Sequence, residues 1–371
     1  MSKTKILVTG ADGFIGKNLC VHLLESDEYE ILKFQRENSD VQLTSLVSQA
    51  DIIFHLAGEN RPKDSALYEV GNVELAQKLV NAIEHSKKRP PVIFTSSAQA
   101  DRENKYGQSK RKAEAIFQEL SVKKGNPVAI YRLPNVFGKW ARPNYNSVVA
   151  TFCSNIANDL PIQIHDSKVL ISLVYIDDVI SNFIDCIKTN NSGVIIGDVA
   201  PIYKITVGEL AQKIFQYKQS RLNLTTEAVG RGIDRALYAT FMSYYQPAQF
   251  SYEFPVYGDE RGIFAEILKT GNSGQISFFT AKPGEVRGGH YHHTKSEKFI
   301  VVKGRAKFTF RNLLTNEIYE IEVTGKKPCI VETIPGWAHN IANVGKDELI
   351  AILWANEVFD RDLPDTYKAS V

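Results

Sequence analysis

The stretch Lys5-Ile-Leu-Val-Thr-Gly-Ala-Asp-Gly-Phe-Ile-Gly16 decides the fold of the first part of this chain. Its first five residues are mostly apolar and predict a buried strand, and the three glycines then lead into a helical pattern. Gly10, Gly13 and Gly16 would let the backbone turn tightly and approach a pyrophosphate, while the helix N-terminus supplies free N–H groups. The stretch therefore predicts a dinucleotide-binding strand–turn–helix unit.

Further strand and helix patterns alternate through residues 5–245. Short apolar runs at 52–56, 92–96 and 128–132 are typical of buried parallel strands, and amphipathic helical patterns separate them. This alternation predicts an α/β fold with a doubly wound parallel sheet of the Rossmann type.

The hydrophobic period changes to two from about residue 250. Ala306, Phe308 and Phe310 alternate with polar residues, as in a strand with one buried face. We therefore expect two domains, a nucleotide-binding domain at 1–246 and an all-β sandwich or barrel at 247–371, joined near Pro247.

Composition excludes some classes of function. The 371 residues include 44 basic and 42 acidic side chains, for a formal net charge of +2. This balance argues against binding to nucleic acid or to a membrane surface, since either needs a basic excess. No stretch approaches the about 18 apolar residues of a membrane span, and no signal peptide precedes the first strand. A cytoplasmic protein is expected.

The end of the second strand predicts which cofactor is bound. An acidic side chain after Phe34 would hold the 2′-hydroxyl of an adenosine ribose, but this chain has Gln35 and Arg36 there. A guanidinium favours a 2′-phosphate, so Arg36 predicts NADP(H) rather than NAD(H). The alternative is that Arg36 is only a solvated loop charge.

Tyr106 and Lys110 lie one helical turn apart on the same face. An ammonium group beside a phenol favours the phenolate, so we expect Lys110 to lower the pKa of Tyr106 and make it a proton donor to a carbonyl that receives hydride. A serine from the preceding strand end would orient that carbonyl. Ser97 is the first choice and Ser96 the second, and only eight residues separate Ser97 from Tyr106.

These motifs together resemble the extended short-chain dehydrogenase/reductase family, in its nucleotide-sugar group. The resemblance rests on the glycine stretch, His55-Leu-Ala-Gly58, Tyr106-Gly-Gln-Ser-Lys110-x3-Glu114, Arg132-Leu-Pro-Asn-Val-Phe-Gly138 and Tyr175-Ile-Asp-Asp-Val179. It implies that Tyr106, Lys110 and Ser97 are catalytic. It also implies cofactor contacts from Phe14, Ile15, Leu56, Ala57, Tyr106 and Lys110, and substrate contacts from Asn72, Asn135 and Arg142.

A second constellation of polar residues lies in the β-rich part, as Gly284-x5-His290-x-His292-x4-Glu297-x6-Gly304 followed by His339. His290 and His292 would point to one face of a strand. Three imidazoles and one carboxylate suit Zn²⁺, Ni²⁺, Fe²⁺ or Mn²⁺. The spacing resembles the first cupin motif, and Gly336-x2-His339-x3-Asn343 resembles the second. The resemblance implies a cupin barrel holding one divalent ion, for which zinc is expected; the alternative is a cupin that lost its ion.

The order of the two parts resembles the bifunctional CapF-type family of capsular-polysaccharide enzymes. That resemblance implies a UDP-linked 4-keto amino sugar as substrate, UDP-2-acetamido-2,6-dideoxy-β-L-arabino-4-hexulose. The cupin would epimerise C3 and the reductase would reduce C4 with NADPH, giving UDP-N-acetyl-6-deoxy-L-talosamine for N-acetyl-L-fucosamine synthesis. Three alternatives stay open: a single-activity 4-ketoreductase whose cupin binds sugar or drives dimerisation, an epimerase or dehydratase that regenerates its cofactor, and a non-enzymatic NADP sensor. A homodimer is expected.

Overall fold

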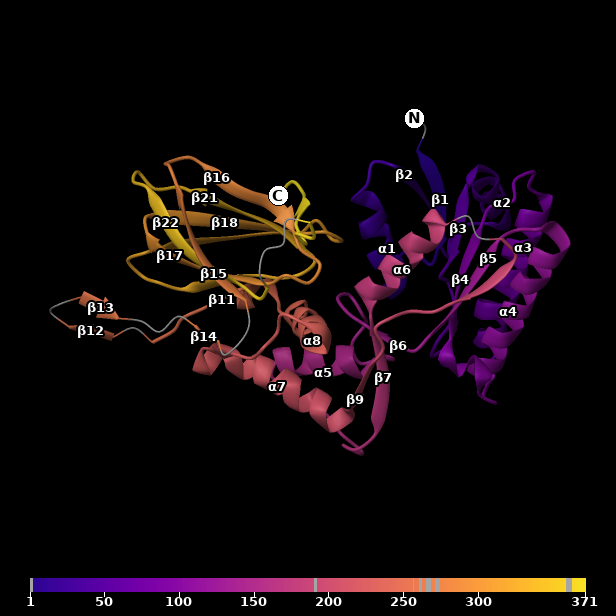
Figure 1. Ribbon diagram of the computed structural model, residues 1–371, viewed down its shortest axis with the longest axis horizontal. Coiled ribbons are helices and arrows are strands. Elements are labelled where there is room, and N and C mark those ends of the chain that lie inside the picture. Colours follow the sequence, from indigo (N-terminus) through magenta and orange to yellow (C-terminus); the bar gives the residue numbers. More distant parts are fainter. Residues whose placement is uncertain are drawn as a thin grey trace. The chain divides into compact units, whose positions relative to one another are not determined.

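The computed structural model describes residues 3–189, 192–255, 257–259, 262–264, 268–270, 274–357 and 362–371. It divides into two compact units (Figure 1). The first unit is Met1–Ser147 with Ile171–Lys204, and the second is Val148–Leu170 with Ile205–Val371.

A six-stranded sheet forms the centre of the first unit, in the order β2-β1-β3-β4-β5-β8. All its neighbouring strands are parallel. The strands are β1 (Thr4–Thr9), β2 (Tyr29–Phe34), β3 (Ile52–His55), β4 (Val92–Ser97), β5 (Val128–Leu133) and β8 (Val194–Gly197). The strand order reverses between β1 and β3, so the expected doubly wound topology is confirmed.

Helices cover both faces of this sheet (Figure 1). One face carries α1 (Phe14–Leu24) and α6 (Ile176–Lys188), and the other carries α2 (Asp40–Gln49), α3 (Leu75–His85) and α4 (Lys105–Lys124). The π-helical turn η1 (Glu69–Glu74) and the 3₁₀ turn η2 (Ala98–Asp101) precede α3 and α4. No helix of the described residues is both long enough and apolar enough to cross a membrane.

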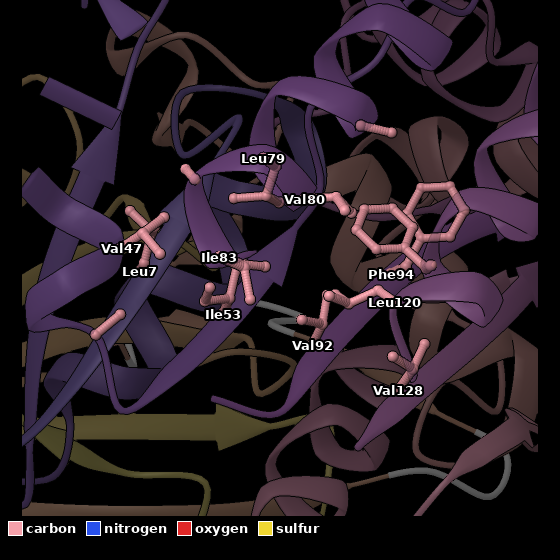
Figure 2. Close-up of a cluster of buried hydrophobic side chains, with 14 of the residues drawn as sticks. Leu7, Val47, Ile53, Leu79, Val80, Ile83, Val92, Phe94, Leu120 and Val128 are labelled. Atoms are coloured by element: carbon pink, nitrogen blue, oxygen red, sulfur yellow. The ribbon is translucent and has the colours of Figure 1, made fainter. Parts of the chain in front are cut away.

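Apolar side chains fill the space between the sheet and α2, α3 and α4 (Figure 2). The strands contribute Leu7, Ile53, Val92, Phe94 and Val128, and the helices contribute Val47, Leu79, Val80, Ile83 and Leu120. The strand residues are at most 2% exposed because both faces of a parallel sheet are covered. This rigid core holds the carboxyl ends of the strands in place.

The second unit contains two antiparallel sheets of five strands each. One sheet is β11 (Ser251–Tyr252), β20 (Ile330–Thr333), β17 (Glu297–Lys303), β22 (Leu349–Ala355) and β15 (Gln275–Ala281). The other is β19 (Ile318–Thr324), β18 (Arg305–Asn312), β21 (Trp337–Asn343), β16 (Val286–Tyr291) and β23 (Tyr367–Lys368). The expected all-β region is therefore present.

Shorter elements complete the chain. β6 (Asn135–Phe137), β7 (Leu170–Tyr175) and β9 (Tyr203–Thr206) form a small sheet, β12 (Tyr257–Asp259) pairs with β13 (Gly262–Phe264), and β10 (Thr225–Thr226) pairs with β14 (Lys269–Thr270). The second unit also holds helices α5 (Val148–Ala157), α7 (Val207–Asn223) and α8 (Gly232–Met242) and the 3₁₀ turn η3 (Pro247–Gln249).

The compact units divide the chain differently from the expected domains 1–246 and 247–371. Helix α7 packs with the β-strands, since Leu224 at its end belongs to one apolar cluster with Ile300 and Ile330. Arg221 of the same helix pairs with the buried Glu332 of β20. These contacts place α5, α7 and α8 in the second unit, and the division near Pro247 remains a prediction about domains.

Candidate active site and metal centre

The glycine-rich turn lies where the strand order of the parallel sheet reverses. Thr9 ends β1 beside His55 at the end of β3, and Thr9 Oγ1 lies 2.9 Å from His55 Nδ1. Gly10 has a φ of +71°, and a Cβ there would lie 2.7 Å from the Ala57 nitrogen. Only glycine allows this backbone approach, and the crevice at such a switch point is where α/β proteins bind nucleotides.

The N-terminus of α1 fits a pyrophosphate. Gly13 occupies its N-cap, and within the described chain no side chain caps it and no acidic residue lies in its first turn. By contrast, α2 and α7 carry complete capping boxes at Ser39 and Thr206. The N–H groups at the start of α1 therefore stay available to an anion.

Arg36 lies in the loop after β2, and its contact with a 2′-phosphate remains a prediction. Its side chain is 88% exposed, and its guanidinium pairs with the carboxylate of Glu59. Gln35 beside it donates its amide to Asp12 of the glycine turn. No local sequence pattern indicates that Glu59 is the partner of Arg36, because Glu59 comes from the segment after β3.

Tyr106 and Ser97 meet because the eight-residue link between them is tightly folded. The Ser97 hydroxyl lies beside the Tyr106 phenol, close enough to lower its pKa. Gly107 lies against the preceding 3₁₀ turn, where a Cβ would come within 2.2 Å of the Gln99 carbonyl oxygen. Asn104 caps α4 by accepting a 2.7 Å hydrogen bond from the Gly107 nitrogen. The short link thus brings the two hydroxyls together.

Ser96 points to a different partner. Its hydroxyl donates to the carboxylate of Glu114, which is 3% exposed and also binds the Arg132 guanidinium at 2.9 and 2.7 Å. This buried network uses the Ser96 hydroxyl, so the geometry favours Ser97 as the residue beside Tyr106.

The predicted effect of Lys110 on Tyr106 is wrong for this structure. Burial raises the pKa of Tyr106 above its usual value, and the hydrogen bond from Ser97 offsets this only in part. Lys110 is 6% exposed and its ammonium donates to the Thr95 carbonyl oxygen at 3.0 Å, while burial lowers its own pKa to about 8. A raised pKa keeps the Tyr106 phenol protonated, as a proton donor requires.

Asn72 is buried and hydrogen-bonded inside the protein, and its substrate contact remains a prediction. The side chain is 2% exposed, and its Oδ1 accepts a 2.9 Å hydrogen bond from the Glu59 nitrogen. Its Nδ2 donates to the Glu59 carbonyl oxygen at 3.0 Å and to Ser109 Oγ at 2.9 Å. Both amide hydrogens are therefore used inside the protein.

Asn135 and Arg142 keep exposed polar groups. Asn135 Nδ2 donates to the Ser172 carbonyl oxygen at 3.1 Å, and the Arg142 guanidinium lies 5.1 Å from the centre of the Tyr145 ring. The loop between them is anchored by Lys139, which is 1% exposed and places its ammonium 2.7 Å from the Asp177 carboxylate. Their role as substrate contacts remains a prediction.

The four predicted metal ligands converge in the second unit. His290 lies on β16, Glu297 opens β17 and His339 lies on β21 opposite His290, while His292 follows β16. One ligand atom from each lies within 4.8 Å of the others. Glu297 Oε2 is 3.2 Å from His292 Nε2 and 3.4 Å from His339 Nε2.

The charge states of this cluster suit a divalent cation. Burial and the neighbouring imidazoles lower the pKa of His290 to about 4, which leaves its ring neutral near pH 7. Burial alone would raise the pKa of Glu297, but His292 and His339 hold it well below its usual value. Neutral imidazoles and an ionised carboxylate are the forms that bind Zn²⁺ and similar ions.

Asp365 supports this cluster, although the sequence analysis missed it. Its carbonyl oxygen accepts a 2.6 Å hydrogen bond from His292 Nδ1, which leaves Nε2 facing Glu297. Its carboxylate accepts hydrogen bonds of 3.0, 2.8 and 2.7 Å from the nitrogens of His293, Thr294 and Lys295. No local spacing signals this residue, since it follows His292 by 73 positions.

Comparisons with known proteins identify the family. Residues 6–199 match the NAD dependent epimerase/dehydratase family, and residues 257–367 match the polysaccharide biosynthesis C-terminal domain. The UDP-2-acetamido-2,6-beta-L-arabino-hexul-4-ose reductase of Pseudomonas aeruginosa PA103 is 53% identical over 367 residues, or 99% of each chain. The capsular polysaccharide assembling protein CapF from Staphylococcus aureus is 39% identical, with a TM-score of 0.67 over 99% of this chain and 100% of that one. The chain belongs to the CapF-type family.

More distant structures share only the fold of the first part. The UDP-glucuronic acid 4-epimerase from Bacillus cereus, solved with NAD, is 21% identical, with a TM-score of 0.51. The matched region covers 59% of this chain and 84% of the epimerase chain. Membership of the epimerase/dehydratase family implies a nicotinamide cofactor, and the uncapped α1 and close-packed glycines fit one.

Proposed function

We propose that this protein is an NADPH-dependent reductase of a UDP-linked 4-keto amino sugar. The observation that supports it most is that Ser97, at the end of β4, lies beside the Tyr106 phenol at the carboxyl edge of the parallel sheet. The glycine turn lies at the same edge. The 53% identity to a UDP-hexulose reductase over nearly the whole chain supports this substrate class.

The side chains have separate roles in this proposal. Tyr106 donates its phenolic proton to the C4 oxygen, and Ser97 donates a hydrogen bond to the same oxygen and holds the carbonyl in place. Gly10, Gly13, Phe14, Ile15 and Gly16 bind the pyrophosphate with their backbone, Leu56 and Ala57 border the cofactor, and Arg36 binds the 2′-phosphate. Lys110 binds the cofactor ribose, and Asn135 and Arg142 contact the sugar nucleotide. The bound nicotinamide supplies the hydride.

Cofactor consumption with a panel of sugars tests this proposal. The purified protein should oxidise NADPH in proportion to added UDP-4-keto-6-deoxy amino sugar, and more slowly with the dTDP-linked analogues. Sugar conversion without net NADPH oxidation would instead indicate an epimerase or dehydratase that regenerates its cofactor. Binding of NADPH without any turnover across the panel would indicate a cofactor sensor.

We further propose that the second unit is a cupin that binds one divalent ion, expected to be zinc, and epimerises C3 before the reduction. A ketone at C4 acidifies the hydrogen at C3, and a metal can stabilise the resulting negative charge. His290, His292, Glu297 and His339 would hold the ion. The product would be UDP-N-acetyl-6-deoxy-L-talosamine, made by a cytoplasmic homodimer for capsular polysaccharide.

Removal of the metal should separate the two activities. After treatment with a chelator, we expect incorporation of deuterium at C3 from heavy water to stop and to return when Zn²⁺ is added. Reduction of a substrate that already has the product configuration at C3 should persist. If deuterium never enters C3 in the metal-loaded protein, the epimerase proposal is wrong and the second unit serves sugar binding or dimerisation.

The pH dependence of the reduction rate should reflect the ionisation of Lys110. Its pKa is lowered to about 8 by burial, so the ammonium is lost as the pH rises through that value. The phenol of Tyr106, with its raised pKa, stays protonated over the same range. We expect kcat/KM to fall above about pH 8, and Lys110→Arg to move this alkaline limb upward. If kcat/KM of the variant falls at the same pH as that of the wild type, another group is responsible for the fall.

A further inference from the structure

Two acidic side chains lie at the loop after β2, where the proposed function places the adenosine 2′-phosphate. Arg36 pairs with Glu59, and Asp12 accepts the Gln35 amide. Arg36 is the cation that would recognise the 2′-phosphate, yet its guanidinium already forms an ion pair with the Glu59 carboxylate. This juxtaposition is unusual for a phosphate site, because a carboxylate repels the phosphate that the arginine attracts.

We infer that Glu59 is a specificity-determining residue, whose carboxylate competes with the 2′-phosphate of NADP(H) for Arg36 and so limits discrimination against NAD(H). This inference rests on the proposed use of NADPH. Glu59 follows His55-Leu-Ala-Gly58, so it lies in the segment that leaves β3 beside the glycine turn.

The backbone of Glu59 is fixed from both sides. Buried Asn72 accepts a hydrogen bond from the Glu59 nitrogen at 2.9 Å and donates one to its carbonyl oxygen at 3.0 Å. The side-chain stem lies on Gly71, where a Cβ would come within 2.5 Å of the Glu59 Cγ. The Glu59 side chain is only 22% exposed, so its carboxylate has little freedom to leave.

Arg36 is the mobile member of the pair. Its side chain is 88% exposed, so it can turn toward a bound phosphate without any rearrangement of the core. Its Nη2 binds Glu59, so a phosphate that takes this nitrogen must displace the carboxylate, which then lies uncompensated beside the phosphate. A 2′-hydroxyl carries no charge, so Glu59 exerts no comparable penalty on NAD(H). Asp12 accepts its hydrogen bond from the Gln35 amide, whereas Arg36 pairs with Glu59, so Glu59 is the carboxylate that competes for the guanidinium.

The size of the effect follows from the exposure of the pair. Exposed ion pairs and charge repulsions through water change binding constants by a few-fold, so removal of the Glu59 charge should tighten binding of a 2′-phosphate by about 3–10-fold. Binding of a ligand that has only the 2′-hydroxyl should change less than about twofold, since no charge is added or removed at that position.

Calorimetric titration with 2′,5′-ADP and 5′-AMP measures the effect of Glu59 on binding of the 2′-phosphate directly, without turnover. We expect Glu59→Gln and Glu59→Ala to lower the dissociation constant of 2′,5′-ADP by about 3–10-fold and to leave that of 5′-AMP within about twofold. Glu69→Gln is the matched control, because Glu69 is an exposed carboxylate on the neighbouring π-helical turn that pairs with Lys112 instead. Unchanged or weaker binding of 2′,5′-ADP by both Glu59 variants would overturn the inference.

Arg36→Gln distinguishes failure of this inference from failure of the proposed cofactor. If Arg36→Gln weakens binding of 2′,5′-ADP while the Glu59 variants bind it as the wild type does, only the role of Glu59 is wrong. If the wild type binds 2′,5′-ADP no more tightly than 5′-AMP, and Arg36→Gln changes neither, the preference for NADPH is wrong and the inference fails with it.

Discussion

Tyr106→Phe should abolish most of the reduction while leaving the protein folded and able to bind NADPH. The change removes one hydroxyl, which lies beside Ser97 and would donate the proton to the sugar C4 oxygen. General acid catalysis of this kind contributes about 10²–10⁴-fold to a rate, so we expect kcat for NADPH oxidation to fall within that range. The KM of the sugar should change little, because the ring remains.

Tyr29→Phe provides the matched control for this variant. Tyr29 opens β2, at the end of the sheet opposite to the one that carries the glycine turn, so loss of its hydroxyl should leave kcat unchanged. NADPH affinity, measured by quenching of tryptophan fluorescence, should be equal in both variants and the wild type. Wild-type turnover by Tyr106→Phe would show that another group donates the proton.

Lys139→Met should cause a large loss of stability in the first unit. Lys139 is 1% exposed, its ammonium is 2.7 Å from the Asp177 carboxylate, and His22 Nε2 lies 3.2 Å from the same oxygen. The variant keeps most of the side-chain volume but leaves the largely buried Asp177 without its lysine. Removal of one partner of a buried ion pair costs about 3–5 kcal/mol in the free energy of unfolding, which urea denaturation would measure.

A double substitution distinguishes charge from packing as the cause of this loss. Lys139→Met with Asp177→Asn removes both charges, so it should recover part of the free energy that the single variant loses. Lys78→Met is the surface control, because its exposed pair with Asp40 should contribute less than about 1 kcal/mol. A loss below about 1 kcal/mol for Lys139→Met would mean that water reaches Asp177 and replaces the lysine.

Local sequence was enough to predict the Rossmann-type sheet, the all-β region and the ligand cluster. Gly10, Gly13 and Gly16 follow a strand and open a helix, and their spacing in this context predicts the turn. His290 and His292 have the alternate spacing of a strand face, and the structure brings them together with Glu297 and His339, although His292 lies just past the end of β16. Such features depend on the periods of helices and strands, which neighbouring residues determine.

The choice between Ser96 and Ser97 could not be made from the sequence. Both serines end the same strand, and the decision comes from Glu114, which takes the Ser96 hydroxyl and leaves Ser97 beside Tyr106. The hydrogen bonds of Asn72 could not be predicted for the same kind of reason, since its partners Glu59 and Ser109 are 13 and 37 positions away. Hydrogen-bond partners that are distant in sequence have no local signal.

The sequence by itself determined which residue types stand at the two sites and which element carries each of them. Only the tertiary structure decided their electrostatic state: burial raises the pKa of Tyr106 where the Tyr-x3-Lys spacing predicted a lowering, and Glu59 occupies Arg36. The physical reason is range. The periodicity of helices and strands depends on residues that are close in sequence. Desolvation and charge pairing depend on residues within a few ångströms in space, which can be far apart in sequence.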